Sequence, residues 1–223
     1  MAAKSLRDLL GELHAERERT WDPAALKLNI DQRRELVEAA DPQAWPAVGA
    51  ALPDFTLEEV DGARLTLESL TADGPAVLVF FRYAGCPACN IALPYYEREL
   101  AAGLRDLGAA LVAVSPQVPE RLVDIKRRHD LSFQVATDRD NVLGRQLGIV
   151  FTTNAANQAA SRAKGAFIGD TTGTGTWDLP QPAVVVIGQD RRAHFVDVSP
   201  DWLVRTEADT ILQAVRALTS VAA

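Results

Sequence analysis

The amino-acid sequence predicts an α/β fold with a central mixed sheet flanked by helices, preceded by a helical extension. Continuous apolar runs at 76–81 and 109–115 have the length and composition of strands that are buried on both faces. Apolar residues at helical spacing follow these runs, over 87–107 and over 119–130. Strands that alternate with helices in this way indicate an α/β sheet with parallel pairs.

The first 50 residues predict a helical extension (1–50) in front of a larger domain (51–223). Apolar residues recur at helical spacing, with charges between them, at Leu6, Leu9, Leu10 and Leu13. A second helix is expected within 31–45, "DQRRELVEAADPQAW", where Asp41-Pro42 ends it. From Pro53 onward the period of the pattern changes to that of strands.

Turn and cap signals place the next elements. Two short alternating runs in 54–70, joined at Asp61-Gly62, predict a hairpin. The segment 133–138 is expected to be a strand that leads into a short helix at 140–148, with Asp140 as its cap.

The C-terminal part is expected to contain one irregular segment, a strand pair and a helix. Residues 152–180 are rich in Thr, Gly, Asn and Ala and predict a long loop or irregular insertion. Residues 183–198 predict an antiparallel pair at the sheet edge. A terminal helix over 206–220 is expected to have Thr206 as its cap. Its buried face is expected to hold Ile211, Leu212, Val215 and Leu218.

Composition narrows the class of function. The 23 basic and 30 acidic side chains give a net charge of −7 without a basic cluster, which argues against a nucleic-acid partner. The apolar runs are far shorter than the roughly 20 residues of a membrane-spanning helix. The N-terminus lacks the apolar core of a signal peptide, and two cysteines are too few for a disulfide framework. We therefore expect a cytoplasmic protein in a reducing compartment, without membrane association.

Both cysteines lie in "FFRYAGCPACNIALPYY", where a buried strand runs through a short turn into a helix. Unpaired N–H groups and the helix dipole stabilise a thiolate at such a helix start. A second thiol one helical turn away can close an internal disulfide, so Cys86 and Cys89 are the predicted catalytic residues.

Two alternatives to a working dithiol remain. A zinc site needs about four ligands, but the chain has no other cysteine, and its three histidines, His14, His129 and His194, are scattered. The second alternative is that both cysteines are only small hydrophobic residues buried in the core. The dithiol interpretation requires neither a metal nor an organic cofactor.

The stretch "VLVFFRYAGCPAC" resembles the active-site segment of the thioredoxin-fold superfamily, and especially of the peroxiredoxin-like AhpC/TSA (redoxin) group. "PDFTLEEVDGARLTLESL", "VATDRDNVLGRQLGI" and "LPQPAVVVIGQDRRAHFVDVSPDWLVR" resemble further segments of peroxiredoxin-like proteins. The resemblance covers roughly residues 50–218 and implies a peroxiredoxin-like thioredoxin fold.

The superfamily offers two templates, and they assign the cysteines differently. In the thioredoxin register Cys86 attacks and Cys89 resolves, and Pro94 matches the proline that kinks the active-site helix. In the peroxiredoxin register Cys89 is the peroxidatic cysteine, Cys86 replaces a threonine, and Arg82 stands where the motif begins with proline. The sequence leaves the attacking thiol open, with Cys89 favoured for peroxide chemistry and Cys86 for thiol–disulfide exchange.

Arg82, Pro87 and Pro182 are the predicted supporting residues of the site. The guanidinium of Arg82 either turns toward the cysteines and stabilises a thiolate and a developing oxyanion, or forms a surface salt bridge. Pro182 matches the cis-proline that faces the dithiol in thioredoxins, with Pro180 as a competing candidate and an ordinary trans proline as the alternative. Trp177 and Trp202 either line the site or only pack in the core.

The resemblance implies a thiol-dependent peroxidase that reduces hydrogen peroxide or organic hydroperoxides and is recycled by thioredoxin or another thiol reductant such as glutathione. A thioredoxin-like thiol–disulfide oxidoreductase with little peroxidase activity is the alternative. A non-catalytic redox sensor or binding module, acting through 152–180, is a third hypothesis. A homodimer is compatible with each of these three functions.

Overall fold

The apolar run that begins at Ala76 forms the central strand of the fold. In the computed structural model, which describes residues 4–221, all five residues of β3 (Ala76–Phe80) are buried. Successive side chains of a strand point to opposite faces, so Val77 and Val79 join one core and Leu78 and Phe80 another. The predicted central strand is therefore confirmed, with a hydrophobic core on each side.

A seven-stranded mixed sheet in the described chain has the order β2-β1-β5-β4-β3-β8-β9. Strands β3, β4 and β5 are parallel, whereas β8 and β9 extend the sheet as an antiparallel pair beyond β3. The hairpin β1–β2 completes the opposite edge through β5. The strands besides β3 are β1 (Thr56–Glu59), β2 (Arg64–Thr66), β4 (Ala110–Ser115), β5 (Gln134–Thr137), β8 (Ala183–Ile187) and β9 (Ala193–Val198).

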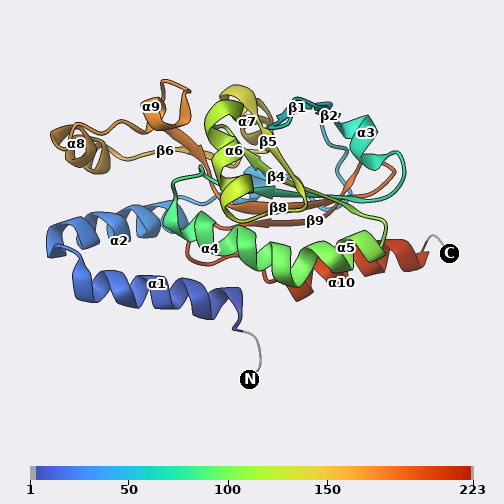
Figure 1. Cartoon of the computed structure of the whole chain (residues 1–223), viewed down its shortest axis with the longest axis horizontal. Coiled ribbons are helices and arrows are strands. Elements are labelled where there is room, and N and C mark those ends of the chain that lie inside the picture. The colour runs from blue at the N-terminus through green and yellow to red at the C-terminus, as the bar shows by residue number, and fades with distance from the viewer. Residues whose placement is uncertain (1–3, 222–223) are drawn as a thin grey trace.

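Helices cover both faces of this sheet (Figure 1). The core that contains Val77 and Val79 is shared with α4 (Pro87–Tyr96), α5 (Ala102–Asp106), α6 (Pro119–Arg128) and α10 (Ala208–Val221). The other core is covered by α3 (Leu67–Thr71) and α7 (Val142–Gln146). The predicted α/β class with a mixed sheet flanked by helices is confirmed.

The helix predicted over 87–107 is present and changes its winding after Pro94. Proline has no N–H to donate, and α4 is followed by a π-helical turn, η2 (Glu97–Ala101), before α5 begins. The N–H of Glu97 is shared between the carbonyls of Leu93 and Pro94.

The N-terminal segment forms α1 (Leu6–Thr20), α2 (Pro23–Glu38) and a short 3₁₀ turn, η1 (Pro42–Ala44). Helix α2 begins well before the predicted start at 31, because the Asp22 carboxylate accepts a hydrogen bond from the N–H of Ala25 and Pro23 suits the first helical position. Leu6 and Leu10 are fully buried in the same core as α4. The division into a 1–50 extension and a 51–223 domain stays a prediction.

The prediction of an irregular 152–180 segment is wrong. This segment contains α8 (Ala155–Ala163) and α9 (Ile168–Thr172), and β6 (Val150–Thr152) pairs with β7 (Asp178–Pro180) as a separate antiparallel ribbon. None of the residues of α8 is buried, and its apolar residues are all alanine, so the sequence lacks the large apolar side chains that signal a helix packed on a core. Asn154 caps it by accepting a hydrogen bond from the N–H of Asn157.

Two predicted helix caps are also wrong. Asp140 lies in the 3₁₀ turn η3 (Arg139–Asn141) with a φ of +57°, and the carboxylate of Asp138 instead accepts hydrogen bonds from the N–H groups of Leu143 and Gly144 in α7. The hydroxyl of Thr206 donates to Asp197 at 2.7 Å, and α10 begins only at Ala208.

Candidate active site

The turn between β3 and α4 presents the two cysteines at the start of a helix. Cys86 is the N-cap of α4, and its carbonyl accepts hydrogen bonds from the N–H groups of Cys89 and Asn90, each at 3.0 Å. The Asn90 side chain donates to the carbonyls of Ala84 and Cys86 and so holds the turn. Pro87 occupies the first helical position, where its missing N–H costs nothing, and it is exposed.

Both thiols are free and fully buried. Burial raises the pKa of the Cys86 thiol, but a hydrogen bond from Cys89 and the charges of Arg82 and Arg205 outweigh it, so the pKa lies well below the usual value. Burial and the neighbouring Cys86 raise the pKa of Cys89 well above its usual value. These directions favour ionisation of Cys86 over ionisation of Cys89.

Arg82 turns toward the dithiol, which decides between the two interpretations of this residue. Its Nη2 lies 3.3 Å from the Sγ of Cys86, and its guanidinium lies 4.3 Å from the centre of the Trp202 ring. Burial alone would lower the pKa of Arg82, but the interactions with Cys86 and Tyr83 raise it by more than burial lowers it. The guanidinium therefore stays charged. Arg82 thus supplies a fixed positive charge next to the Cys86 sulfur.

A second arginine, which the sequence did not single out, contacts the other cysteine. The Nη2 of Arg205 lies 3.4 Å from the Sγ of Cys89, and its Nε donates to the carbonyl of Trp202 at 3.0 Å. Arg205 follows the apolar residues Leu203 and Val204 and is only 8% exposed. The only local sign of burial for Arg205 was its position directly after two apolar residues. That position does not reveal that Arg205 contacts Cys89 in α4.

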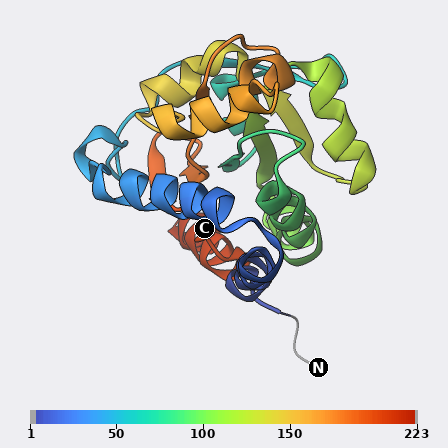
Figure 2. The same ribbon diagram turned by 90° about the vertical axis from the view of Figure 1, so that its left-hand side faces the viewer.

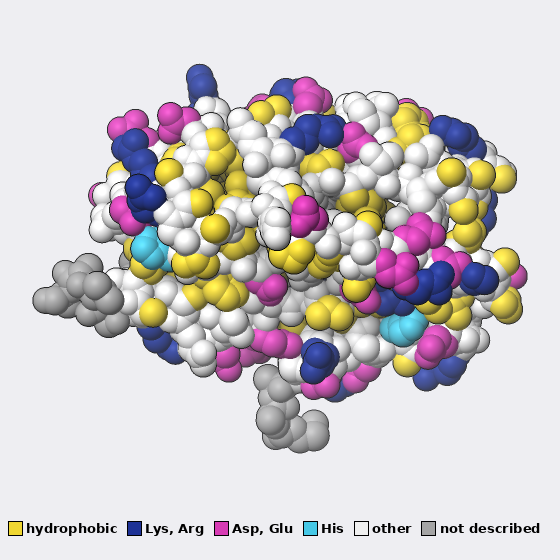
Figure 3. Space-filling model, turned by 180° about the vertical axis from the view of Figure 1, so that it is seen from behind, with side chains coloured by type: hydrophobic (Ala, Val, Ile, Leu, Met, Phe, Trp, Pro, Cys, Tyr) yellow, Lys and Arg dark blue, Asp and Glu magenta, His cyan; other side chains and the backbone are white. Residues whose placement is uncertain are grey.

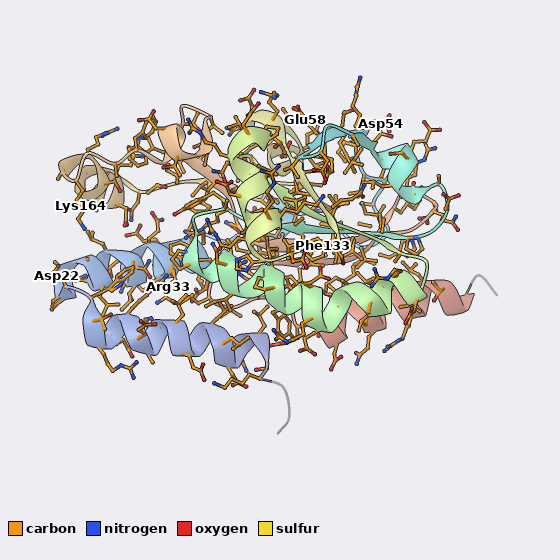
Figure 4. All side chains as sticks on the ribbon, viewed as in Figure 1. Asp22, Arg33, Asp54, Glu58, Phe133 and Lys164 are labelled. Atoms are coloured by element: carbon orange, nitrogen blue, oxygen red, sulfur yellow. The ribbon has the colours of Figure 1, made fainter. Side chains whose placement is uncertain are left out.

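The N-terminal extension adds a third buried arginine to the site. Arg17, on α1, is 5% exposed. Burial lowers its pKa, the Cys86 thiolate raises it, and the charges of Arg82 and Arg33 lower it again. Arg33, labelled in Figure 4, lies on α2. Its guanidinium pairs with Asp201 at 3.1 Å. The extension therefore contributes positive charge to the surroundings of the dithiol.

The prediction of a cis-proline is not supported by the structure, because none of the peptide bonds within residues 4–221 is cis. Pro182 directly precedes β8, and its carbonyl accepts a hydrogen bond from the N–H of Ser199 at 2.7 Å. Pro180 is the last residue of β7. Both prolines thus fit the alternative of an ordinary trans proline at a strand end.

The two tryptophans border a small cavity beside the dithiol, of about 190 Å³. Trp202 is 3% exposed and stacks on Phe151 at 6.4 Å, so it packs in the core as well as lining the cavity. Trp177 packs against Phe167 at 4.7 Å and lines the same cavity. Arg82 lies in the wall of the cavity and also contacts the Cys86 sulfur.

The described residues contain no group of three His, Cys, Asp or Glu side chains arranged to hold a metal ion. Among residues 4–221, none of the helices is both long and apolar enough to span a membrane. Basic and acidic side chains are interspersed on the face drawn in Figure 3. The expectation that the chain binds no nucleic acid stays a prediction.

Comparison with known proteins identifies the family. The model of the AhpC/TSA family matches residues 48–194, more than half of the chain, and the chain therefore belongs to the AhpC/TSA family. A curated relative described as "Putative peroxiredoxin bcp", from Coxiella burnetii (strain RSA 493 / Nine Mile phase I), is 25% identical over 107 residues, which are 48% of this chain and 70% of that protein.

Solved structures share the fold. The peroxidoxin BcpB from Mycobacterium tuberculosis has a TM-score of 0.59 at 21% identity, covering 78% of this chain and 98% of that one. Peroxiredoxin Q from Xanthomonas campestris has a TM-score of 0.56 at 15% identity, covering 74% and 91%. The solution structure of a "putative protein disulfide isomerase" from Bacteroides thetaiotaomicron has a TM-score of 0.54 at 16% identity, covering 78% of this chain and 91% of that one. The predicted peroxiredoxin-like thioredoxin fold is confirmed.

Proposed function

We propose that this chain is a thiol peroxidase that reduces hydrogen peroxide or organic hydroperoxides through a Cys86–Cys89 dithiol/disulfide cycle. The observation that carries the proposal is the contact of 3.3 Å between Arg82 and a Cys86 sulfur at the start of α4. A thiolate held by a fixed charge is the nucleophile that attack on an O–O bond requires. Membership in the AhpC/TSA family and the peroxiredoxins among its relatives support the same activity.

The attack is assigned to Cys86, whereas the sequence favoured Cys89 for peroxide chemistry. The sulfur of Cys86 lies 3.3 Å from the Arg82 guanidinium, the pKa of Cys86 is lowered and that of Cys89 is raised, which favours Cys86 as the nucleophile. The thiolate bonds to one peroxide oxygen, the O–O bond breaks, and the sulfur becomes a sulfenic acid. The leaving oxygen takes up a proton and departs as water or an alcohol. Arg82 stabilises the negative charge that develops on this oxygen.

Cys89 completes the cycle as the resolving thiol. Its sulfur condenses with the Cys86 sulfenic acid, so that an S–S bond forms and the hydroxyl leaves with the Cys89 proton as water. Cys86 caps α4 and Cys89 lies in the first turn of that helix, with its N–H bonded to the Cys86 carbonyl at 3.0 Å, and this arrangement supports closure of the disulfide. Two electrons from thioredoxin or another thiol reductant then restore the dithiol.

A thioredoxin-like thiol–disulfide oxidoreductase is the second candidate. The two-residue spacing of the cysteines and the position of Pro94 inside α4 favour it. The full burial of both sulfurs opposes it, because a protein disulfide needs direct access to the attacking thiol, whereas a peroxide is small. The peroxidase is therefore the better-supported function.

One pair of assays separates these functions. Peroxide consumption with a thioredoxin-recycling system and reduction of insulin disulfides are measured on the wild type, Cys86→Ser and Cys89→Ser. We expect the wild type to consume peroxide and to reduce insulin slowly. Insulin reduction without peroxide consumption would assign the oxidoreductase function. Failure in both assays, with a disulfide that still forms readily, would favour the redox sensor.

A further inference from the structure

The side chain of Asn90 uses all of its hydrogen-bonding capacity at the first turn of α4. Its Nδ2 donates to the carbonyl of Ala84 at 2.7 Å and to that of Cys86 at 2.9 Å. Its Oδ1 lies 2.9 Å from the Nη1 of Arg128 and 2.8 Å from the Nε2 of His129. A primary amide has two N–H donors and an oxygen with two lone pairs, so the four contacts leave none of these unused.

These partners fix the orientation of the Asn90 amide and the tautomer of His129. A carbonyl oxygen only accepts hydrogen bonds and a guanidinium only donates them, so the amide nitrogen faces Ala84 and the amide oxygen faces Arg128. The same oxygen accepts from His129, whose Nε2 therefore carries a proton. Burial and the charge of Arg128 lower the pKa of His129, so its ring is neutral at neutral pH, with the proton on Nε2 alone.

The Asn90 amide connects the cysteine turn to the end of another helix. Arg128 is the last residue of α6, and His129 is its C-cap. Figure 2 shows the end of α6, in yellow-green, beside α4, in green. Leu122 and Ile125 of α6 are fully buried in the core that α6 shares with α4. Asn90 therefore ties the turn to a helix that the core holds in place.

The backbone between the arginine and the first cysteine is held from the sheet as well. The hydroxyl of Ser115, the last residue of β4, donates to the carbonyl of Arg82 at 3.0 Å. The N–H of Ala84 donates to the side chain of Gln117 at 2.7 Å. Asn90 supplies the bonds on the helix side. The segment is therefore fixed by the sheet at one end and by α4 and α6 at the other.

We propose that Asn90 is a positioning residue for the Cys86 thiolate, which it keeps next to the guanidinium of Arg82 by holding the turn between them. The contact between these two side chains measures 3.3 Å, and a hydrogen bond weakens steeply when its geometry is lost. Asn90 acts through the backbone carbonyls of the turn, and Arg128 and His129 hold its amide in the required orientation. The inference rests on the proposed peroxidase function, to which it adds a residue that keeps the nucleophile in place.

The first test follows the reactivity of the sulfur when Asn90 is removed. The rate of Cys86 alkylation by iodoacetamide is measured as a function of pH in Cys89→Ser, with and without Asn90→Ala. The pH midpoint is expected to rise by about one unit, which makes the reaction about tenfold slower at pH values below both midpoints. Thr66→Ala is the control for lost stability, because it removes the cap of α3 on the other face of the sheet, and its midpoint is expected to match that of the parent. A midpoint that is unchanged in Asn90→Ala, even with a lower free energy of unfolding, would leave Asn90 a structural role only and overturn the proposal.

A pair of His129 variants tests the link to α6 in the same assay. His129→Leu removes the donor to Asn90, whereas His129→Gln places an amide N–H near the position of Nε2. The midpoint is expected to rise in His129→Leu and to return toward the parent value in His129→Gln. Equal midpoints in the two variants would contradict the link.

The second test reads the tautomer of His129 in the wild type. A long-range ¹H–¹⁵N NMR spectrum at neutral pH is expected to show the proton on Nε2, with the signals assigned by their loss in His129→Gln. A proton on Nδ1 would contradict the contact with Asn90 and overturn the proposal, whether or not Asn90→Ala folds.

Neither test depends on peroxide turnover, so the failure of the proposed function and the failure of this inference are distinguishable. If the wild type consumes no peroxide but the midpoint rises in Asn90→Ala, the peroxidase function fails and the positioning role of Asn90 stands. If the wild type consumes peroxide and the midpoint is unchanged in Asn90→Ala, the function stands and the positioning role fails.

Discussion

Replacing Arg82 by glutamine tests the origin of the reactive thiolate. The variant removes the guanidinium whose Nη2 lies 3.3 Å from the Cys86 sulfur and leaves a neutral side chain in its place. A hydrogen bond to a charged group contributes about 1.5–3 kcal/mol. Since about 1.4 kcal/mol corresponds to a factor of ten, the rate of thiolate reactions at neutral pH should fall about 10- to 100-fold. The pKa of Cys86 should rise toward that of an ordinary thiol.

The assay is the rate of alkylation of Cys86 by iodoacetamide as a function of pH, in Cys89→Ser and in the same protein with Arg82→Gln. Arg105→Gln is the control, because Arg105 is exposed on α5. Arg82→Lys keeps the charge and should retain more of the reactivity than Arg82→Gln. A pH midpoint that stays the same in Arg82→Gln would refute the role assigned to this arginine.

Three further predictions concern pH, the extension and the support of the fold. Because the pKa of Cys86 is lowered, the rate of peroxide reduction should remain near its maximum at pH values below the pKa of a free thiol. The rate should decline only when the pH falls through the lowered pKa of Cys86, which a pH–rate profile measures. In Glu207→Ala, α1 loses the carboxylate that accepts from the N–H groups of Leu6 and Arg7, so α1 should loosen and Cys86 should be alkylated up to about tenfold faster. In the same variant the pKa of Tyr95, which burial and the bond to Glu207 raise to about 12, should fall in a spectroscopic titration; an unchanged value would contradict the contact. Asp138→Ala leaves two buried N–H groups of α7 without their acceptor and should lower the free energy of unfolding in urea by about 2–4 kcal/mol, with a smaller loss in Asp138→Asn.

The sheet and the dithiol were predictable because local patterns carry them. The apolar runs that form β3 and β4 need burial on both faces, and a strand running into a helix at Cys86 is visible in the sequence itself. Helix α8 was missed because its apolar residues are all alanine, and none of them is buried, so no large apolar side chain marks a core-facing side.

The charges around the cysteines were only partly predictable. Arg82 is four residues from Cys86, close enough for its role to be proposed from the sequence. Arg205 contacts Cys89 across 116 residues of chain, and Arg17 reaches the site from a helix outside the family match. Such contacts depend on how distant elements pack, which no local spacing specifies. The cytoplasmic location and the homodimer stay predictions.

The central claim is that Cys86 attacks the peroxide and Cys89 resolves it, and trapping the sulfenic acid tests it most directly. Cys89→Ser and Cys86→Ser are each treated with one equivalent of hydrogen peroxide in the presence of dimedone, and the adduct is located by mass spectrometry. Rapid labelling of Cys86 in Cys89→Ser, with little labelling of Cys89 in Cys86→Ser, is the predicted result. Rapid labelling of Cys89 in Cys86→Ser, with little labelling of Cys86 in Cys89→Ser, would contradict it and assign the attack to Cys89.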